Sequence, residues 1–173
     1  AQYTNGGWPQ YFPLEDGYSR HITFNDGAYM GVMNLLKKMI TNEPNFAFLD
    51  AKTKRKATTA YQKGLDCILK MQIMEQGKLT AWCQQHNEIT LLPAWARKFE
   101  PPSICNAESA DIVLFLMDID NPNEKIIKSI QSAVKWFSDC KIYNTRIESF
   151  DAPAFDSQFH AKPVIIDRRV VID

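Results

Sequence analysis

The chain has 173 residues, of which 45% are hydrophobic and 23% are charged, and this is typical of a globular domain that can bury a core. Twenty basic residues balance twenty acidic residues, and a zero net charge argues against nonspecific nucleic-acid binding, which needs a basic excess. No apolar run approaches the roughly 20 residues of a membrane-spanning helix, so no membrane association is expected.

The cysteines and the first residues carry little information about chemistry. Cys67, Cys83, Cys105 and Cys140 are scattered and form no CxxC pair, which argues against a zinc site. We interpret them as buried free thiols; the alternative is a disulfide, whose pairing the sequence does not assign. The first ten residues, AQYTNGGWPQ, show neither the basic start nor the apolar segment of a signal peptide.

Turn signals and capping residues predict the secondary structure of the first half of the chain. The turns Asn5-Gly6-Gly7 and Trp8-Pro9 predict an irregular start. A first helix is expected to begin near Thr23 or Asn25, either of which can cap it. A second helix is predicted over 51–71 with Asp50 as its cap, and we interpret the basic residues of its first turns as a solvated face.

The second half alternates between polar loops and apolar helical patterns. We expect a short strand around 79–82 and one or two helical turns over 92–99, which Pro101 and Pro102 end. A third helix is predicted over 107–117, and a fourth from Pro122 or Asn123 to about Cys140.

Alternating residues predict strands over 141–150 and 164–173, with a loop over 151–163 between them. The fold class predicted is therefore mainly α, with hairpins of helices and a few short strands at one end, in one domain over 1–173.

Several long stretches of the chain resemble a known family. The stretches, in chain order, are NGGWPQYFPL, HITFNDGAYMGVM, KGLDCILKMQI, GKLTAWCQQHNEITLLPAWARKFEPPS, NAESADIVLFLMDI and AVKWFSDCKI. Together they resemble the family-ten polysaccharide lyases, the pectate lyases, over nearly the whole chain. The resemblance implies an incomplete α/α toroid and the cleavage of polygalacturonate or oligogalacturonate by β-elimination. It also implies calcium as the cofactor and, because the substrate is a polymer, a secreted or periplasmic location.

The β-elimination implied by the resemblance explains why a cation and a base would be needed. The proton on C5 of a galacturonate is α to a carboxylate and is only weakly acidic. A hard cation or arginines that neutralise the carboxylate stabilise the enediolate that develops when a base removes this proton. In this family the base is an arginine, whose ordinary pKa lies above about 12.

The resemblance also implies roles for charged residues. Asp26 matches the aspartate of the family's active centre, although a helix N-terminal acid is the simpler interpretation. Asn87 and Glu88 fall where the family usually has His-Asp-Glu, and an acid there is expected to hold calcium; Asn87 brings an oxygen ligand without a charge. Their alternative role is hydrogen bonding within the loop. Arg97 is expected either to bind a uronate carboxylate or to form a salt bridge.

Further residues are expected to contact the sugars. His86 is a candidate for orienting a ligand or the substrate, against a purely structural role. Trp8, Tyr11 and Trp82 are candidate platforms on which sugar rings stack, with core packing as the alternative. Trp95 and Trp136 are expected in the core.

The chain also departs from the family's pattern. The family has a further segment with two arginine motifs, one of which supplies the base, and Arg168 and Arg169 do not match them. We therefore expect a module that is partial at both ends, with an oligomeric state that the sequence leaves open. The alternatives are a noncatalytic uronate-binding relative, an inactive fragment, a structural helical domain, and an unsaturated glycuronyl hydrolase with Asp26 as its acid.

Overall fold

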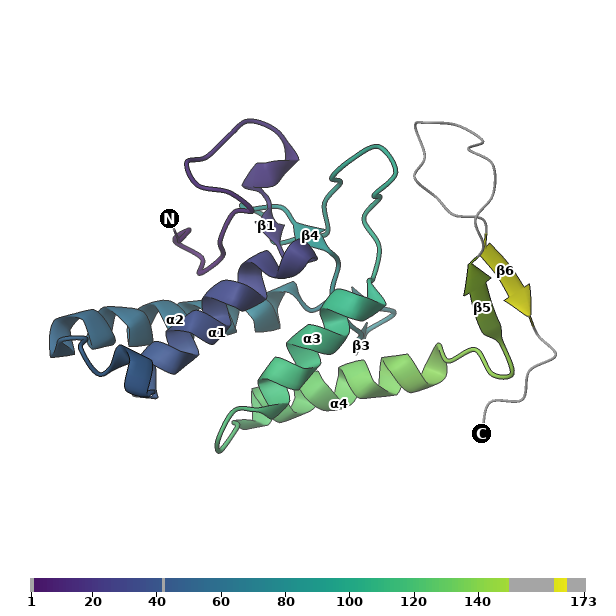
Figure 1. Cartoon of the computed structure of the whole chain (residues 1–173). Coiled ribbons are helices and arrows are strands. Elements are labelled where there is room, and N and C mark those ends of the chain that lie inside the picture. The colour runs from purple at the N-terminus through teal and green to yellow at the C-terminus, as the bar shows by residue number, and fades with distance from the viewer. Residues whose placement is uncertain (1, 42, 150–163, 168–173) are drawn as a thin grey trace. The chain divides into compact units, whose positions relative to one another are not determined.

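The structure, a computed structural model, describes residues 2–41, 43–149 and 164–167 (Figure 1). The chain separates into two compact units, Ala1–Phe137 and Ser138–Asp173, and each is described by itself. The expectation of one domain over the whole chain stays a prediction. Within the described residues, no helix is both long enough and apolar enough to cross a membrane.

The described part of the chain is mainly helical, as the sequence predicts. Its α-helices are α1 (Ala28–Ile40), α2 (Ala51–Met71), α3 (Asn106–Met117) and α4 (Glu124–Asp139). Its short 3-10 helices are η1 (Tyr18–Arg20), η2 (Asn25–Gly27) and η3 (Pro44–Phe46). Its strands are β1 (Ile22–Thr23), β2 (Met74–Glu75), β3 (Lys78–Leu79), β4 (Gln85–His86), β5 (Arg146–Ser149) and β6 (Val164–Asp167), which pair as the antiparallel ribbons β1–β4, β2–β3 and β5–β6.

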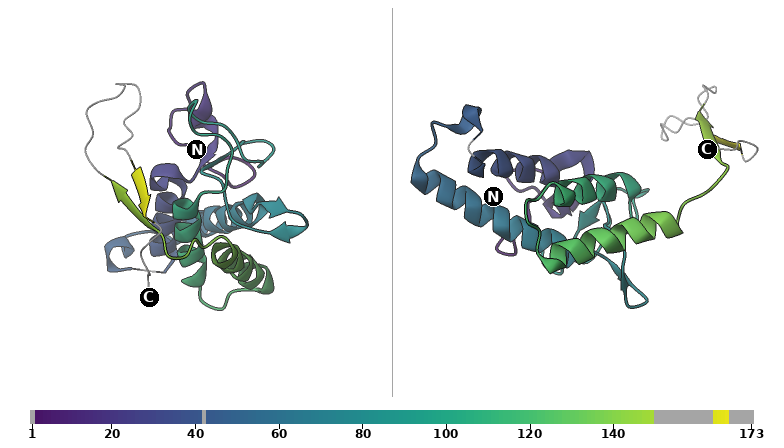
Figure 2. Two further views of the ribbon diagram at one scale, coloured as in Figure 1. Left: turned by 90° about the vertical axis from the view of Figure 1, so that its right-hand side faces the viewer. Right: turned by 90° about the horizontal axis from the view of Figure 1, so that it is seen from below.

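The first unit is built around the faces that its helices turn toward one another. In Figures 1 and 2, α1 lies beside α2, and α1 also contacts α3. Gly64 of α2 permits this close packing, because a Cβ there would lie 2.5 Å from the Met33 sulfur and 2.7 Å from the Trp8 ring. The largest side chains of the core include Tyr29, Phe24, Ile22, Met33, Ile68, Ile112, Leu116 and Trp82.

Trp82 fastens the segment before β4 to two helices. Its indole Nε1 donates a hydrogen bond of 2.9 Å to the Ile68 carbonyl of α2. Its backbone N–H donates to Ser109 Oγ of α3 at 2.9 Å, and that hydroxyl donates back to the Trp82 carbonyl at 3.1 Å. These hydrogen bonds fix the position of the chain at Trp82, where the exposed loop begins to depart from the core.

The helices begin and end close to their predicted bounds, with one exception. Helix α2 spans the predicted residues, and Asp50 caps it by accepting a 2.6 Å hydrogen bond from the Thr53 N–H. Helix α1 begins at Ala28, later than predicted, because Asp26 and Gly27 adopt left-handed conformations with φ of 55° and 68°. Asn25 does not cap it; its Oδ1 accepts the Asp26 N–H at 3.0 Å.

The second half differs from expectation mainly in the loop after β4. Residues 92–99 form no helix, so the helical turns predicted there are wrong. Helices α3 and α4 confirm the predictions to within a few residues, and Asn123 Oδ1 caps α4 by accepting the N–H groups of Lys125 and Ile126. The partly buried ring of Trp136 packs on the core, as expected.

The second unit contains the ribbon of β5 and β6. Its register pairs Arg146 with Asp167 and Ser149 with Val164. These two strands lie inside the stretches predicted as strands. The loop predicted over 151–163, together with Arg168 and Arg169, lies outside the described residues.

Candidate functional site

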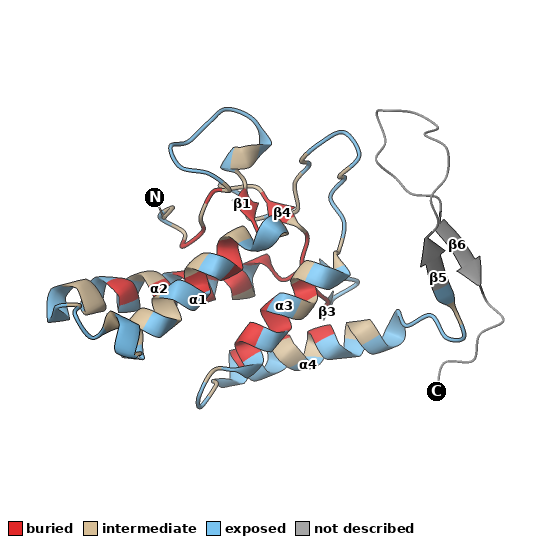
Figure 3. Cartoon of the chain, in the orientation of Figure 1, coloured by how far each residue is buried: buried red, intermediate tan, exposed pale blue. Residues whose placement is uncertain are grey.

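Two exposed loops of the first unit meet at the β1–β4 ribbon. This ribbon pairs Ile22 with His86 and Thr23 with Gln85. It joins the loop 10–21, which precedes β1, to the loop 87–103, which follows β4. Both loops rise from the same side of the unit in Figure 1, and Figure 3 shows that they are largely exposed. Polar residues from distant parts of the sequence therefore share one surface, which we call the loop surface.

Asp26 stands next to this ribbon on an exposed turn. The backbone N–H of Phe24 donates a 2.8 Å hydrogen bond to the Gln84 carbonyl, which anchors the turn to the chain before β4. The left-handed conformation of Asp26 then sets the direction of its carboxylate, which is exposed. Asp26 thus lies at the surface where the resemblance predicts an active-centre acid.

Arg97 is held by Glu100 in a tight turn of the second loop. Arg97 Nε donates to Glu100 Oε2 at 2.8 Å, and a second guanidinium nitrogen donates to the other carboxylate oxygen. The guanidinium also lies 4.8 Å from the centre of the Phe99 ring. The salt bridge expected as one alternative is therefore present, yet the Arg97 side chain remains 52% exposed and available to a ligand.

Electrostatics connects Arg97 with Asp26. The hydrogen bond to Glu100 raises the pKa of Arg97, and the nearby Asp26 and Tyr18 raise it further. The same hydrogen bond lowers the pKa of the Glu100 carboxyl below its ordinary value. Arg97 is consequently a permanent cation on the loop surface, which suits it to binding a carboxylate rather than to accepting a proton.

Glu88 forms a second charged cluster with Arg20 and His21. Its carboxylate lies 2.9 Å from His21 Nδ1 and 3.6 Å from Arg20 Nε, and its side chain is only 14% exposed. Burial by itself raises the pKa of Glu88, but the hydrogen bond to His21 and the charges of His21 and Arg20 outweigh it, so the pKa is lowered. Asn5 Nδ2 also donates to the Glu88 carbonyl at 2.8 Å.

The oxygens predicted to hold calcium are already engaged by the protein. Asn87 Oδ1 accepts the N–H groups of Ile89 and Thr90 at 3.0 and 2.9 Å, which supports the alternative of hydrogen bonding within the loop. The Glu88 carboxylate is paired with two basic side chains. The described residues contain no group of three or more His, Cys, Asp and Glu side chains that could hold a metal ion. As they lie here, Asn87 and Glu88 do not fit a calcium site.

Two of the predicted sugar contacts are buried. His86 has no exposed surface; its Nε2 accepts the Cys83 N–H at 3.3 Å, and its Nδ1 donates to the Leu91 carbonyl at 2.8 Å. Burial lowers the pKa of His86 to about 4, so its ring is neutral near pH 7. Trp82 is equally buried. Both side chains hold the loop to the core and expose no surface to a ligand in this structure, so their contact with the substrate stays a prediction.

The exposed aromatic side chains are partly those predicted and partly others. Tyr11 is 55% exposed, so its predicted role as a sugar platform stays a prediction. The half-buried Trp8 packs edge-on against Tyr29, with 5.0 Å between the centres of the two rings. Trp95 is 56% exposed, and its predicted place in the core is wrong. Trp95 and Tyr18 are exposed aromatic side chains of the loop surface that the sequence did not single out as sugar contacts.

Comparisons with known proteins agree on one family. A family model described as pectic acid lyase matches residues 1–169. A solved family 10 polysaccharide lyase from Cellvibrio cellulosa is 32% identical, with a TM-score of 0.79, over 83% of this chain and 46% of the other. A mutant of family 10 polysaccharide lyase from the same organism, in complex with trigalacturonic acid, is 30% identical, with a TM-score of 0.81, over 95% of this chain and 50% of the other.

The chain thus spans about half the length of the solved structures that it matches. The search of curated protein sequences found no match.

Proposed function

Because the chain belongs to the pectic acid lyase family, we propose that its loop surface binds oligogalacturonate as part of a module that cleaves polygalacturonate by β-elimination. The family match over residues 1–169 and a relative of known structure in complex with trigalacturonic acid support the substrate class. Within the structure, the observation that carries the proposal is the exposed Arg97 guanidinium, which Glu100 holds in place on the loop surface.

Arg97 is suited to the carboxylate of a uronate. A guanidinium can bind a carboxylate with two parallel hydrogen bonds, and Glu100 fixes its direction before a ligand arrives. A cation on the uronate carboxylate stabilises the enediolate that forms when the C5 proton leaves. Because Glu100 raises its pKa, Arg97 stays protonated, so we assign it to binding and not to proton removal.

Asp26 is the proposed carboxylate of the active centre. Its exposed oxygens can accept hydrogen bonds from sugar hydroxyls, and its charge attracts the Arg97 guanidinium. The exposed rings of Tyr11 and Trp95 add flat apolar surfaces of the kind on which sugar faces stack. In the reaction proposed, the C5 proton passes to a base, a C4–C5 double bond forms, and the C4 oxygen leaves with the electron pair of the broken bond.

Calcium assistance is the finer part of the proposal, and the family resemblance alone supports it. The described residues contain no cluster of three or more acidic, histidine or cysteine side chains that could hold the ion. In a calcium-dependent reaction, carboxylates of the substrate would supply ligands that such a cluster would otherwise provide. The export of the protein to meet an extracellular polymer is likewise a proposal that follows from the substrate class.

The direct test is an assay of the chain with polygalacturonate, with and without calcium, that follows the ultraviolet absorbance of an unsaturated uronide. We expect the absorbance to rise with time. Asp26→Asn, which tolerates the left-handed backbone, should lower the rate of this rise by about a hundredfold or more. Asp66→Asn, at an exposed site on α2, is the matched control. A rise that Asp26→Asn leaves unchanged would refute the role of Asp26.

A noncatalytic uronate-binding protein is the second candidate. One observation favours it: the Arg97 guanidinium donates to both carboxylate oxygens of Glu100, which keeps it protonated and unfit to serve as the base. A flat absorbance trace together with measurable trigalacturonate binding would establish this alternative. A flat trace without binding would leave the structural helical domain.

A further inference from the structure

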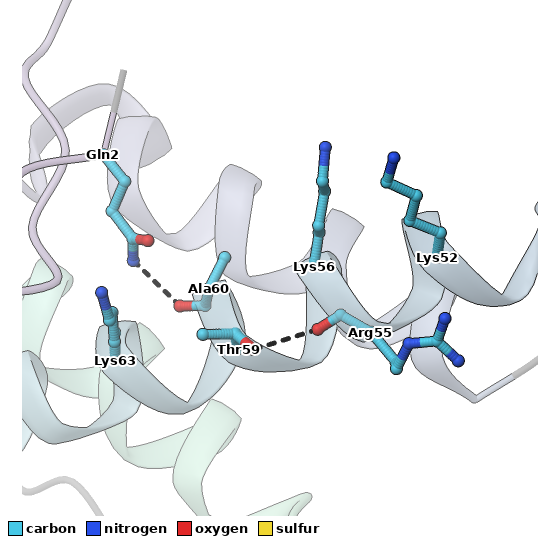
Figure 4. Close-up of a pocket in the computed structure, with 7 residues that line it drawn as sticks. All are labelled: Gln2, Lys52, Arg55, Lys56, Thr59, Ala60 and Lys63. Atoms are coloured by element: carbon cyan, nitrogen blue, oxygen red, sulfur yellow. Dashed lines mark hydrogen bonds between the residues drawn. The ribbon is translucent and has the colours of Figure 1, made fainter.

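The outward face of α2 carries a row of basic side chains around a shallow hollow of about 360 Å³ (Figure 4). The lining residues are Gln2, Lys52, Arg55, Lys56, Thr59, Ala60 and Lys63. Figure 4 shows Lys52 and Lys56 reaching outward from neighbouring turns of the helix and Lys63 two turns further on; these three lysines and Arg55 are exposed. We call Lys52, Arg55, Lys56 and Lys63 the basic face.

The basic face has little acidic compensation. Residues 51–63 contain no Asp or Glu, although the chain as a whole has equal numbers of acidic and basic residues. The acids that flank this stretch are Asp50, which accepts a hydrogen bond from Thr53 as the helix cap, and Asp66, three residues beyond Lys63. In the part of the chain that the structure describes, none of the four cations forms an ion pair.

This arrangement does not help the helix itself. Lys52 and Lys56 are four residues apart, so their like charges face each other and repel. Cations in the first turns also oppose the positive end of the helix dipole. An anionic ligand would relieve both effects, and this makes the basic face a stronger candidate for binding than for stability.

A short segment connects the basic face to the loop surface. Gln2 Nε2 donates to the Ala60 carbonyl of α2 at 2.9 Å, while Asn5 Nδ2 donates to the Glu88 carbonyl at 2.8 Å. Three residues of chain span at most about 11 Å. The Arg20–His21–Glu88 cluster therefore lies near the end of the basic face, on the same unit.

We propose that the basic face binds uronate carboxylates of a polygalacturonate chain at a second site, separate from the loop surface. The inference rests on the proposed function, which supplies a ligand with one carboxylate on each sugar. From Lys52 to Lys63 the helix rises about 16 Å, so a row of cations faces a row of anions. The proposed function, and not the charge balance of the chain, selects this ligand over nucleic acid, which is also a polyanion.

The test compares two triple variants of the full chain by calorimetric titration. Lys52→Gln/Arg55→Gln/Lys56→Gln removes three charges of the basic face. The matched control, Lys38→Gln/Lys125→Gln/Lys128→Gln, removes three exposed cations from α1 and α4. The probes are long polygalacturonate, trigalacturonate, fully methyl-esterified polygalacturonate and duplex DNA.

We expect the variant of the basic face to bind long polygalacturonate about tenfold more weakly or worse, with a shallower dependence on salt. Trigalacturonate binding should change less than about twofold, the control variant should bind like the original chain, and the neutral polymer should bind poorly. Circular dichroism should show unchanged helicity, because the substitutions relieve repulsion. If the triple variant nevertheless unfolds, Arg55→Gln and Lys56→Gln are tested singly for a smaller loss in the same direction.

Equal polymer affinities for the original chain and the basic-face variant, or equal losses in both triple variants, would overturn the proposal. Duplex DNA that binds as tightly as the polymer and loses affinity in the same variant would show a general polyanion surface and would also overturn it. If trigalacturonate binds no form of the chain while polymer binding is lost only in the basic-face variant, the proposed function of the loop surface fails and the second site stands.

Discussion

At the residue scale, the charged side chains of the loop surface are organised before any ligand binds. Glu100 fixes Arg97, and Glu88 joins Arg20 and His21. Exposed ion pairs contribute little to stability, but they reduce the freedom that a side chain loses when it binds. The Glu88–His21 pair is expected to matter more for the fold than the Arg97–Glu100 pair, because His21 is 20% exposed whereas Arg97 is 52% exposed.

We predict that Glu88→Gln lowers the free energy of unfolding by about 1–2 kcal/mol, because His21 and Arg20 lose a charged, partly buried acceptor. Glu75→Gln, at an exposed strand residue, should change it by less than about 0.5 kcal/mol. Urea titrations near neutral pH measure both. Added calcium should leave the unfolding midpoint of the original chain unchanged; a calcium-dependent midpoint that Glu88→Gln abolishes would contradict the assignment of Glu88 to an ion pair.

The buried His86 predicts a dependence of stability on pH. Its pKa is about 4 in the folded chain and near the ordinary 6.5 when unfolded, so the unfolded chain binds more protons between these values. Stability should therefore fall as pH decreases from about 6.5 to 4, by on the order of 2 kcal/mol from this residue. His86→Gln is expected to be less stable at neutral pH, with a flatter profile. An equally steep profile in His86→Gln would show that other groups cause the loss.

At the element scale, local signals determine how much the sequence predicts. Helix α2 was predictable because Asp50, a helical apolar pattern and the end at Met71 all agree. The start of α1 was not, because the left-handed Asp26 depends on pairing between β1 and a distant β4. The helical turns expected over 92–99 failed for the same reason, since His86 bridges to Pro93 and the chain turns back there.

The packing of α1 against α2 depends on one glycine. An added methyl group at Gly64 would lie 2.5 Å from the Met33 sulfur and 2.7 Å from the Trp8 ring, so Gly64→Ala should destabilise the chain by about 1–3 kcal/mol. Gly31 of α1 has open space around its Cβ position, so Gly31→Ala should stabilise it by about 0.5–1 kcal/mol. Urea titrations measure the free energy of unfolding of both variants. A stabilising effect of Gly64→Ala would contradict the close packing of α1 on α2.

At the scale of the whole molecule, the candidate site was predictable as a region rather than as a set of contacts. Motif resemblance located the two loops that the β1–β4 ribbon joins. It could not separate the inward side chains, Trp82 and His86, from the outward Trp95, because the pairing of distant segments decides which side chains enter the core. The neutral total charge likewise concealed the concentration of cations on one face of α2.

The central claim is that the loop surface binds oligogalacturonate through Arg97, and calorimetric titration of trigalacturonate tests it most directly. Arg97→Gln removes the exposed guanidinium, whereas Lys98→Gln removes the neighbouring exposed cation and serves as the control. We predict that Arg97→Gln weakens binding about tenfold or more, as the loss of a charged hydrogen-bonding group implies, while Lys98→Gln changes it less than about twofold. Equal affinities of the original chain and Arg97→Gln would contradict the account.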